Sequence, residues 1–251
     1  MTTPSSDPLV AAAGAALAAE AGSADLHARA AETGAQAGAE PPPKVAPSAP
    51  ASLRKRPKPG ERREQILQTL ASMLQQPGAD RVTTAALAAR LDVSEAALYR
   101  HFASKAQMFE ALIEFIEQSI FTFVNQYNER EQASGDTPSG ARQAAGIVSM
   151  LLRFSEKNPG MTRVMVGDAL VFENVRLQQR MNNFFDKIEA ALRQALRASA
   201  EANGSATPSV DSQVVASALT AFAVGRLHRF ARSGFKRSPT EHLEASLARM
   251  L

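Results

Sequence analysis

The apolar positions of this chain recur every three or four residues from Glu61 onward, which is the spacing of amphipathic helices. The first such run carries Ile66, Leu70 and Leu74 along one face and stops at Pro77, because proline cannot continue a helix. The pattern therefore predicts a first helix that begins at Glu61 and ends before Pro77.

The next helices are predicted to begin at residues whose hydroxyl groups cap helices well. Thr83, Ser94 and Ser104 each precede an apolar segment, and a side-chain oxygen there can accept a hydrogen bond from the first turn. The helix after Ser94 is too short to be stable alone, so we expect its neighbours to hold it. The helix after Thr83 is predicted to end near Asp92. The later helices are predicted to span residues 95–101, 105–129, 141–157, 160–171, 174–199, 209–232 and 240–250.

Residue composition supports the same fold class. The chain has no Trp and two Tyr, and its long stretches of Ala, Leu, Arg, Gln and Glu favour helices, so we predict an all-α fold. Charges interrupt every helix candidate before about 18 apolar residues have passed, which argues against a membrane span. The Ala-rich run 9–19 has no Lys or Arg before it, so we expect no export signal. The absence of Cys excludes disulfides and thiolate sites, and we expect a cytoplasmic protein.

Composition also divides the chain into four segments. Residues 1–53 are rich in Ala, Gly, Ser and Pro and are predicted to be a disordered tail, because they offer little apolar area to bury. Residues 54–60 form a basic arm in which two prolines prevent a helix. Residues 61–105 hold the three short helices, and residues 106–251 are predicted to form a helical core.

The positive charge is concentrated near the short helices. Residues 1–53 have a net charge of −3, residues 54–105 of +5 and residues 106–251 of +1. A local excess of this kind lowers the free energy of approach to a polyphosphate by releasing condensed counterions. The four basic side chains of the arm fit the minor groove of DNA, although a solubilising linker would look the same. These are Arg54, Lys55, Arg56 and Lys58.

Two short helices joined by a tight turn are typical of a helix-turn-helix, whose second helix reads base edges in the major groove. In this interpretation the scaffold residues are Ala88, Ala89, Val93, Leu98 and Phe102. Glu95 can accept from a cytosine amino group, and Ala96 and Ala97 can touch thymine methyl groups. The other candidates suit phosphate oxygens and set register. The full set of predicted DNA-binding residues is Arg62, Arg63, Thr83, Thr84, Ser94, Glu95, Ala96, Ala97, Tyr99, Arg100, His101 and Lys105.

The segment from Arg81 to Lys105 resembles the DNA-binding segment of TetR-family regulators, above all at Tyr99, His101 and Lys105. The resemblance implies a TetR-like fold, with an N-terminal three-helix helix-turn-helix domain over residues 61–105 and a C-terminal helical dimerisation domain over residues 106–251. Asp92 stands where this family usually has Gly, and Asp is among the few residues that tolerate a left-handed conformation.

A closer resemblance, over about residues 61–251, is to the nucleoid occlusion factors of the SlmA family. The segments that carry it are 93–102, 108–109, 112–117 and 158–160. The resemblance implies a nucleoid-associated homodimer that binds palindromic double-stranded DNA. When DNA-bound, such a dimer inhibits polymerisation of the tubulin-like division GTPase FtsZ and assembly of the septum over the chromosome.

The same resemblance marks Phe115, Lys157 and Asn158 as the surface for the division protein. Phe115 and Phe121 lie off the main apolar stripe of the long helix, and burial in the core is the favoured alternative for Phe121. Phe123 and Arg153 differ from what the family presents along this surface.

A dimer interface is predicted on the helix 209–232, where small and branched residues allow close packing about a two-fold axis. The alternative is that this helix packs within one subunit. The predicted interface residues are Val214, Val215, Ala218, Leu219 and Phe222.

Catalytic chemistry is poorly represented in the sequence. The four histidines are scattered, and no nucleophile motif, phosphate loop or metal-ligand cluster is present, so we expect neither an enzyme nor a cofactor or metal. A ligand-responsive TetR-type transcriptional repressor is the main rival function, since the same helical core can hold a drug-sized pocket.

Overall fold

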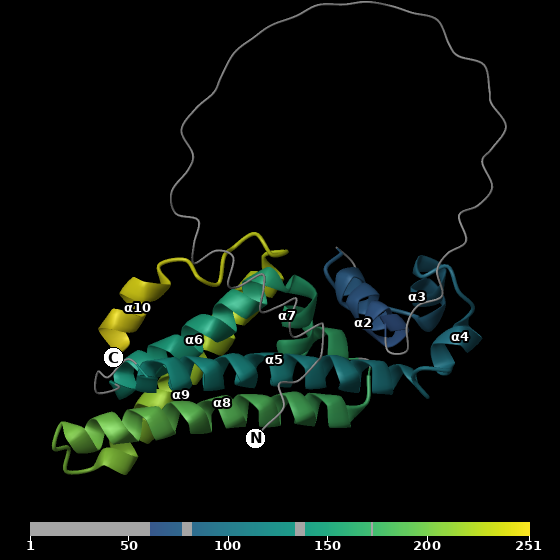
Figure 1. Cartoon of the computed structure of the whole chain (residues 1–251). Coiled ribbons are helices and arrows are strands. Elements are labelled where there is room, and N and C mark those ends of the chain that lie inside the picture. The colour runs from purple at the N-terminus through teal and green to yellow at the C-terminus, as the bar shows by residue number, and fades with distance from the viewer. Residues whose placement is uncertain (1–60, 77–81, 134–138, 172) are drawn as a thin grey trace, which may run out of the picture. The chain divides into compact units, whose positions relative to one another are not determined.

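The computed structural model describes residues 61–76, 82–133, 139–171 and 173–251, without the side chains of residues 128 and 130–133. Within these ranges all regular structure is helical, which confirms the all-α prediction (Figure 1). The predicted tail and the basic arm with Arg54, Lys55, Arg56 and Lys58 lie outside the described residues. The elements are α2 (Glu61–Leu74), α3 (Thr84–Arg90), α4 (Glu95–Tyr99), α5 (Lys105–Ala133), α6 (Gly140–Lys157), α7 (Pro159–Met165), the 3₁₀ turn η1 (Asp168–Leu170), α8 (Val175–Ala202), α9 (Pro208–Arg232) and α10 (Leu243–Met250).

The three predicted caps are present. The Oγ1 atom of Thr83 accepts from the Ala86 N–H at 3.2 Å, and the Oγ atom of Ser94 accepts from the Ala97 N–H at 3.3 Å. The Oγ atom of Ser104 likewise accepts from the third residue after it at 3.2 Å. Each bond satisfies an N–H group that the first helical turn leaves without a backbone partner.

Two predicted helices are cut short at a residue with a left-handed backbone. The predicted helix 160–171 divides into α7 and η1 because Gly167 has a φ of +84°. The predicted helix 240–250 begins only at Leu243, because His242 before it has a φ of +51°. A right-handed helix cannot pass through such a residue.

The hydrophobic core lies among α5, α6, α8 and α9, where α6 and α8 contact each other and also contact both α5 and α9. One face of α5 supplies Phe109, Ile113, Ile116 and Ile120, each with 1% or less of its surface exposed. Among the described residues, no helix is long and apolar enough to span a membrane.

Helix α2 packs against the start of α7 with almost no space between the backbones. A Cβ atom added at Gly160 would lie 1.9 Å from the carbonyl oxygen of Ala71, so no larger residue fits there without movement. The turn formed by Asn158, Pro159 and Gly160 is therefore in direct contact with α2.

Candidate nucleic-acid interface

The turn between α3 and α4 is a Schellman motif. The Val93 N–H donates to the Ala88 carbonyl at 3.1 Å, and the Asp92 N–H donates to the Ala89 carbonyl at 3.2 Å. Asp92 occupies the left-handed position of this motif with a φ of +54°. The prediction that Asp92 accepts the conformation that Gly usually takes here is confirmed.

The core side of α4 anchors this five-residue helix. Leu98 and Phe102 are 1% and 2% exposed, as predicted for scaffold residues. The Thr84 hydroxyl donates to a carboxylate oxygen of Glu95 at 2.6 Å and links α3 to α4. Ala88 is buried and Val93 is half-buried. Ala89 is exposed, so the prediction that it is a scaffold residue at the helix crossing is wrong.

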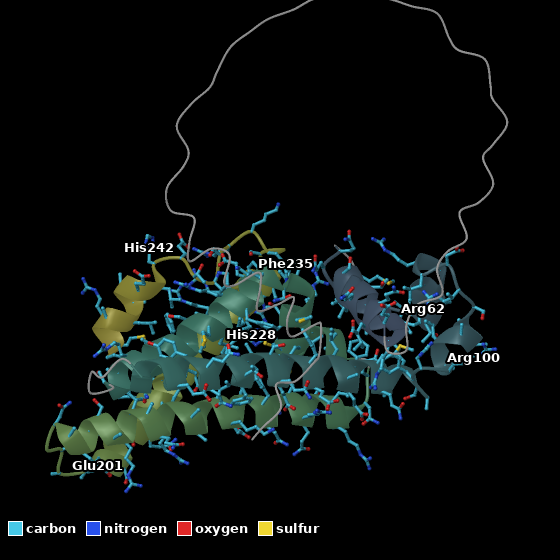
Figure 2. All side chains as sticks on the ribbon, viewed as in Figure 1. Arg62, Arg100, Glu201, His228, Phe235 and His242 are labelled. Atoms are coloured by element: carbon cyan, nitrogen blue, oxygen red, sulfur yellow. The ribbon has the colours of Figure 1, made fainter. Side chains whose placement is uncertain are left out.

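The opposite side of α4 is open to solvent. Glu95, Ala96, Tyr99 and Arg100 are exposed there, and His101 follows directly. Tyr99 is 46% exposed, so a large part of this aromatic side chain lies in solvent and is available to a partner. Figure 2 shows Arg100 projecting away from the helical core. Ala97 is half-buried and faces less fully outward.

Several predicted phosphate-binding hydroxyls already take part in the local structure. Thr83 and Ser94 accept backbone hydrogen bonds as caps, which leaves their hydroxyl protons free to be donated. Thr84 instead donates its proton to Glu95. The sequence pattern identified Glu95 as a base acceptor but missed that one of its oxygens is engaged in this brace.

The basic candidates at the domain edges are held in defined positions. The Arg63 guanidinium lies 4.8 Å from the centre of the Phe102 ring, and Arg62 donates to the side chain of Gln65 at 3.2 Å. The Lys105 ammonium forms an ion pair with Glu173, in the loop before α8. Glu173 was not a sequence candidate, since it lies 68 residues from Lys105.

The predicted surface for the division protein is only partly exposed. Phe115 is 7% exposed, so it offers little area to a partner. Lys157 is exposed, and half-buried Asn158 donates from its side chain to the Phe154 carbonyl at 2.8 Å, which closes the end of α6. Phe121 is half-buried and packs edge-on against Phe184 with ring centres 6.0 Å apart, so the core alternative predicted for it is met only in part.

One side of α9 presents small and branched residues to solvent. Val210 and Val214 are 61% and 64% exposed, and Ala218 is exposed further along the helix. A groove of about 990 Å³ runs between this face and the C-terminal half of α8. Two other predicted interface residues, Val215 and Phe222, are half-buried and are not among the residues that line the groove.

Leu219 differs from the other predicted interface residues. Its side chain is 0% exposed in the single chain, because it points into the core that α9 shares with α6 and α8. Leu219 therefore supports α9 from within its own subunit and has no surface left for a second copy.

Two family models match the chain. The model described as bacterial regulatory proteins, tetR family, matches residues 66–112, and the model described as tetracyclin repressor-like, C-terminal domain, matches residues 142–250. The first covers α3, α4 and the turn between them. The prediction that the chain is not an enzyme agrees with these matches to regulatory proteins.

Curated relatives match most of the chain. It is 50% identical over 184 residues to the nucleoid occlusion factor SlmA of Photobacterium profundum, an alignment that covers 73% of this chain and 90% of the relative. It is 48% identical over 184 residues to the factor of the same name from Idiomarina loihiensis, with the same coverage.

Solved structures show the same fold at low sequence identity. The transcriptional regulator FadR from Bacillus subtilis, crystallised in complex with stearoyl-CoA, superposes with a TM-score of 0.59 at 13% identity, over 74% of this chain and 96% of that one. A likeness at this identity concerns the fold alone.

Proposed function

Because the chain belongs to the SlmA family of TetR-type proteins, we propose that it is a DNA-binding nucleoid occlusion factor that restrains FtsZ when bound to the chromosome. The observation that carries the proposal is the capped and braced α4, whose outer face is free of packing contacts with the core. The relatives' name supplies the division role, and the geometry of α3 and α4 supports the DNA role.

In the proposed complex α4 lies in the major groove. Ala96 and Ala97 let the backbone approach the bases, and the second carboxylate oxygen of Glu95 accepts from a base amino group. Tyr99 and His101 donate to phosphates and fix the register of the helix. Preorganisation by the Thr84–Glu95 hydrogen bond supports this assignment, because Glu95 then enters the groove in one rotamer.

The exposed face of α9 supports the proposal of a homodimer. Val210 and Val214 leave apolar surface in water that a second copy would cover, and the adjoining groove is large enough to receive side chains of a partner helix. A two-fold axis there presents α4 twice, so the bound site is a palindrome whose half-sites lie about 34–36 Å, or a multiple of this distance, apart from centre to centre.

The proposed FtsZ surface is the exposed end of α6 with Lys157 and Asn158. Its position favours a DNA-dependent effect, because the next residues reach Gly160, whose backbone rests on Ala71 of α2. Any displacement of α2 by DNA is therefore passed to this turn. Phe115 on α5 is buried, so it is not part of the proposed contact face.

Sedimentation of FtsZ polymers tests the proposal. Purified dimer is added to FtsZ and GTP with a selected palindromic duplex, with a scrambled duplex, or with no DNA. We expect loss of pelleted polymer only with the specific duplex. Unchanged polymer in all three arms, together with chromosomal sites confined to promoters, would contradict the proposal and indicate the ligand-responsive repressor instead.

A further inference from the structure

A second concentration of basic residues lies at the end of the chain, far in sequence from the helix-turn-helix. Residues 226–251 carry six Lys and Arg side chains against two Glu. Here the end of α9, the following loop and the start of α10 enclose a pocket of about 330 Å³. Its lining residues are Arg226, Arg229, Arg237, Ser238, Pro239, Glu241, His242 and Ser246.

Arg226 forms a fixed wall of this pocket. Its guanidinium donates to the carbonyls of Pro239 at 2.9 Å and Glu241 at 2.6 Å and to the Ser246 hydroxyl at 3.1 Å, and it lies 4.5 Å from the centre of the Phe222 ring. Burial lowers the pKa of Arg226 and the positive charge of Arg229 lowers it further, while the carboxylate of Glu241 offsets part of this shift. Two like charges are thus held close together, an arrangement that an anion would relieve.

Arg229 and Arg237 supply the donors that remain. Neither guanidinium has a hydrogen-bond or ion-pair partner among the residues that the structure describes, although each lines the pocket. Glu241, the one carboxylate in the lining, lies 3.9 Å from the His242 ring. Three guanidinium groups against one carboxylate leave the pocket with a net positive charge.

The loop that closes the pocket is firmly anchored. The Ser238 and Thr240 hydroxyls donate to the two carboxylate oxygens of Glu156 on α6, with a distance of 2.7 Å for Thr240. Phe235 and His242 both have left-handed backbones, with φ of +64° and +51°. Strained residues of this kind persist where surrounding contacts fix them, and they concentrate at ligand sites. Figure 2 marks both residues.

We propose that this pocket binds a soluble anion that carries two or more phosphate groups, with Arg229 and Arg237 gripping the phosphate oxygens beside Arg226. Guanidinium groups match phosphate oxygens in paired hydrogen bonds, and several of them together favour a multiply charged anion over a single carboxylate. Apart from the His242 ring, the lining includes no aromatic or long aliphatic side chain, which disfavours an acyl chain or a stacked base as the main contact. The site is therefore suited to a di- or triphosphate group.

Titration calorimetry of the full-length dimer with inorganic triphosphate at low salt tests the proposal. The variant Arg229→Ala/Arg237→Ala spares Arg226 and its structural bonds, and we expect it to bind triphosphate at least about tenfold more weakly than the wild type. Arg249→Ala removes an exposed charge from α10 outside the pocket and should bind like the wild type. Equal binding by all three proteins, or no heat with the wild type, would overturn the site.

Two further arms separate the soluble ligand from other polyanions. Vesicles with anionic phospholipid and a specific DNA duplex are offered to the wild type and to the double variant. We expect the vesicles and the duplex to bind the double variant as tightly as the wild type, whereas triphosphate binds the double variant more weakly. If the double substitution abolishes vesicle or duplex binding and leaves triphosphate binding unchanged, the arginines serve that surface and the proposal is wrong.

Discussion

Substitution of Val214 by Asp tests the dimer through an exposed residue of the predicted interface. Val214 is 64% exposed on α9, so about two-thirds of its side chain is available for burial by a second copy. Full burial of a Val side chain contributes about 1.5–3 kcal/mol, which gives about 1–2 kcal/mol for each copy here. A two-fold interface contains the residue twice, so its loss costs about 2–4 kcal/mol of dimer stability, and two unpaired carboxylates add to that cost.

This loss corresponds to a dimer dissociation constant that rises by a factor between about 30 and several hundred. Sedimentation equilibrium over a range of concentrations measures it. The matched control is Val175→Asp, since Val175 is 75% exposed at the start of α8 and lies away from the α9 face. If Val214→Asp dimerises as tightly as the wild type and as Val175→Asp, the α9 face is not the interface.

Five other changes probe separate parts of the molecule. Tyr99→Ala is expected to weaken binding to every duplex, measured by fluorescence anisotropy. Lys105→Ala should also weaken binding and in addition flatten the slope of log affinity against log salt by about one, as loss of a phosphate contact does. An unchanged slope would exclude a phosphate contact of Lys105. Glu173→Gln frees the Lys105 ammonium and should tighten DNA binding by up to about fivefold, because such ion pairs contribute about 1 kcal/mol or less; weaker binding would mean that the pair positions Lys105 for DNA. Gly160→Ala should destabilise the fold by about 1–3 kcal/mol and lower the midpoint in thermal unfolding, since the new Cβ meets the Ala71 carbonyl; an unchanged midpoint would show that α2 and α7 move apart freely. Lys157→Asp should leave duplex affinity intact but abolish the effect on FtsZ sedimentation, and loss of both activities would indicate misfolding instead.

Features set by neighbouring residues could be predicted from the sequence. Thr83, Ser94 and Ser104 cap their helices because a hydroxyl reaches N–H groups two or three residues ahead, a distance that spacing alone fixes. Asp92 adopts its left-handed backbone for an equally local reason. Most helix bounds follow from the same short-range patterns.

Features set by distant residues were missed. The Lys105–Glu173 pair and the anchoring of Ser238 by Glu156 join residues 68 and 82 positions apart, which no periodicity can bring together. Leu219 and Phe115 were predicted to lie on binding surfaces, but both are buried. A residue on a predicted surface is covered when a further helix packs beside it, and the pattern within one helix does not reveal this. The net charge of residues 106–251 likewise concealed the arginine pocket, since acidic residues elsewhere in that segment offset it.

Stoichiometry on a palindromic duplex tests the central claim that the exposed face of α4 is presented twice to DNA. Analytical ultracentrifugation of the chain with a selected palindrome, and with the same duplex after one half-site is scrambled, measures it directly. We expect an even number of chains on the intact palindrome and a large loss of affinity on the scrambled one. A single chain bound with equal affinity to both duplexes would contradict it.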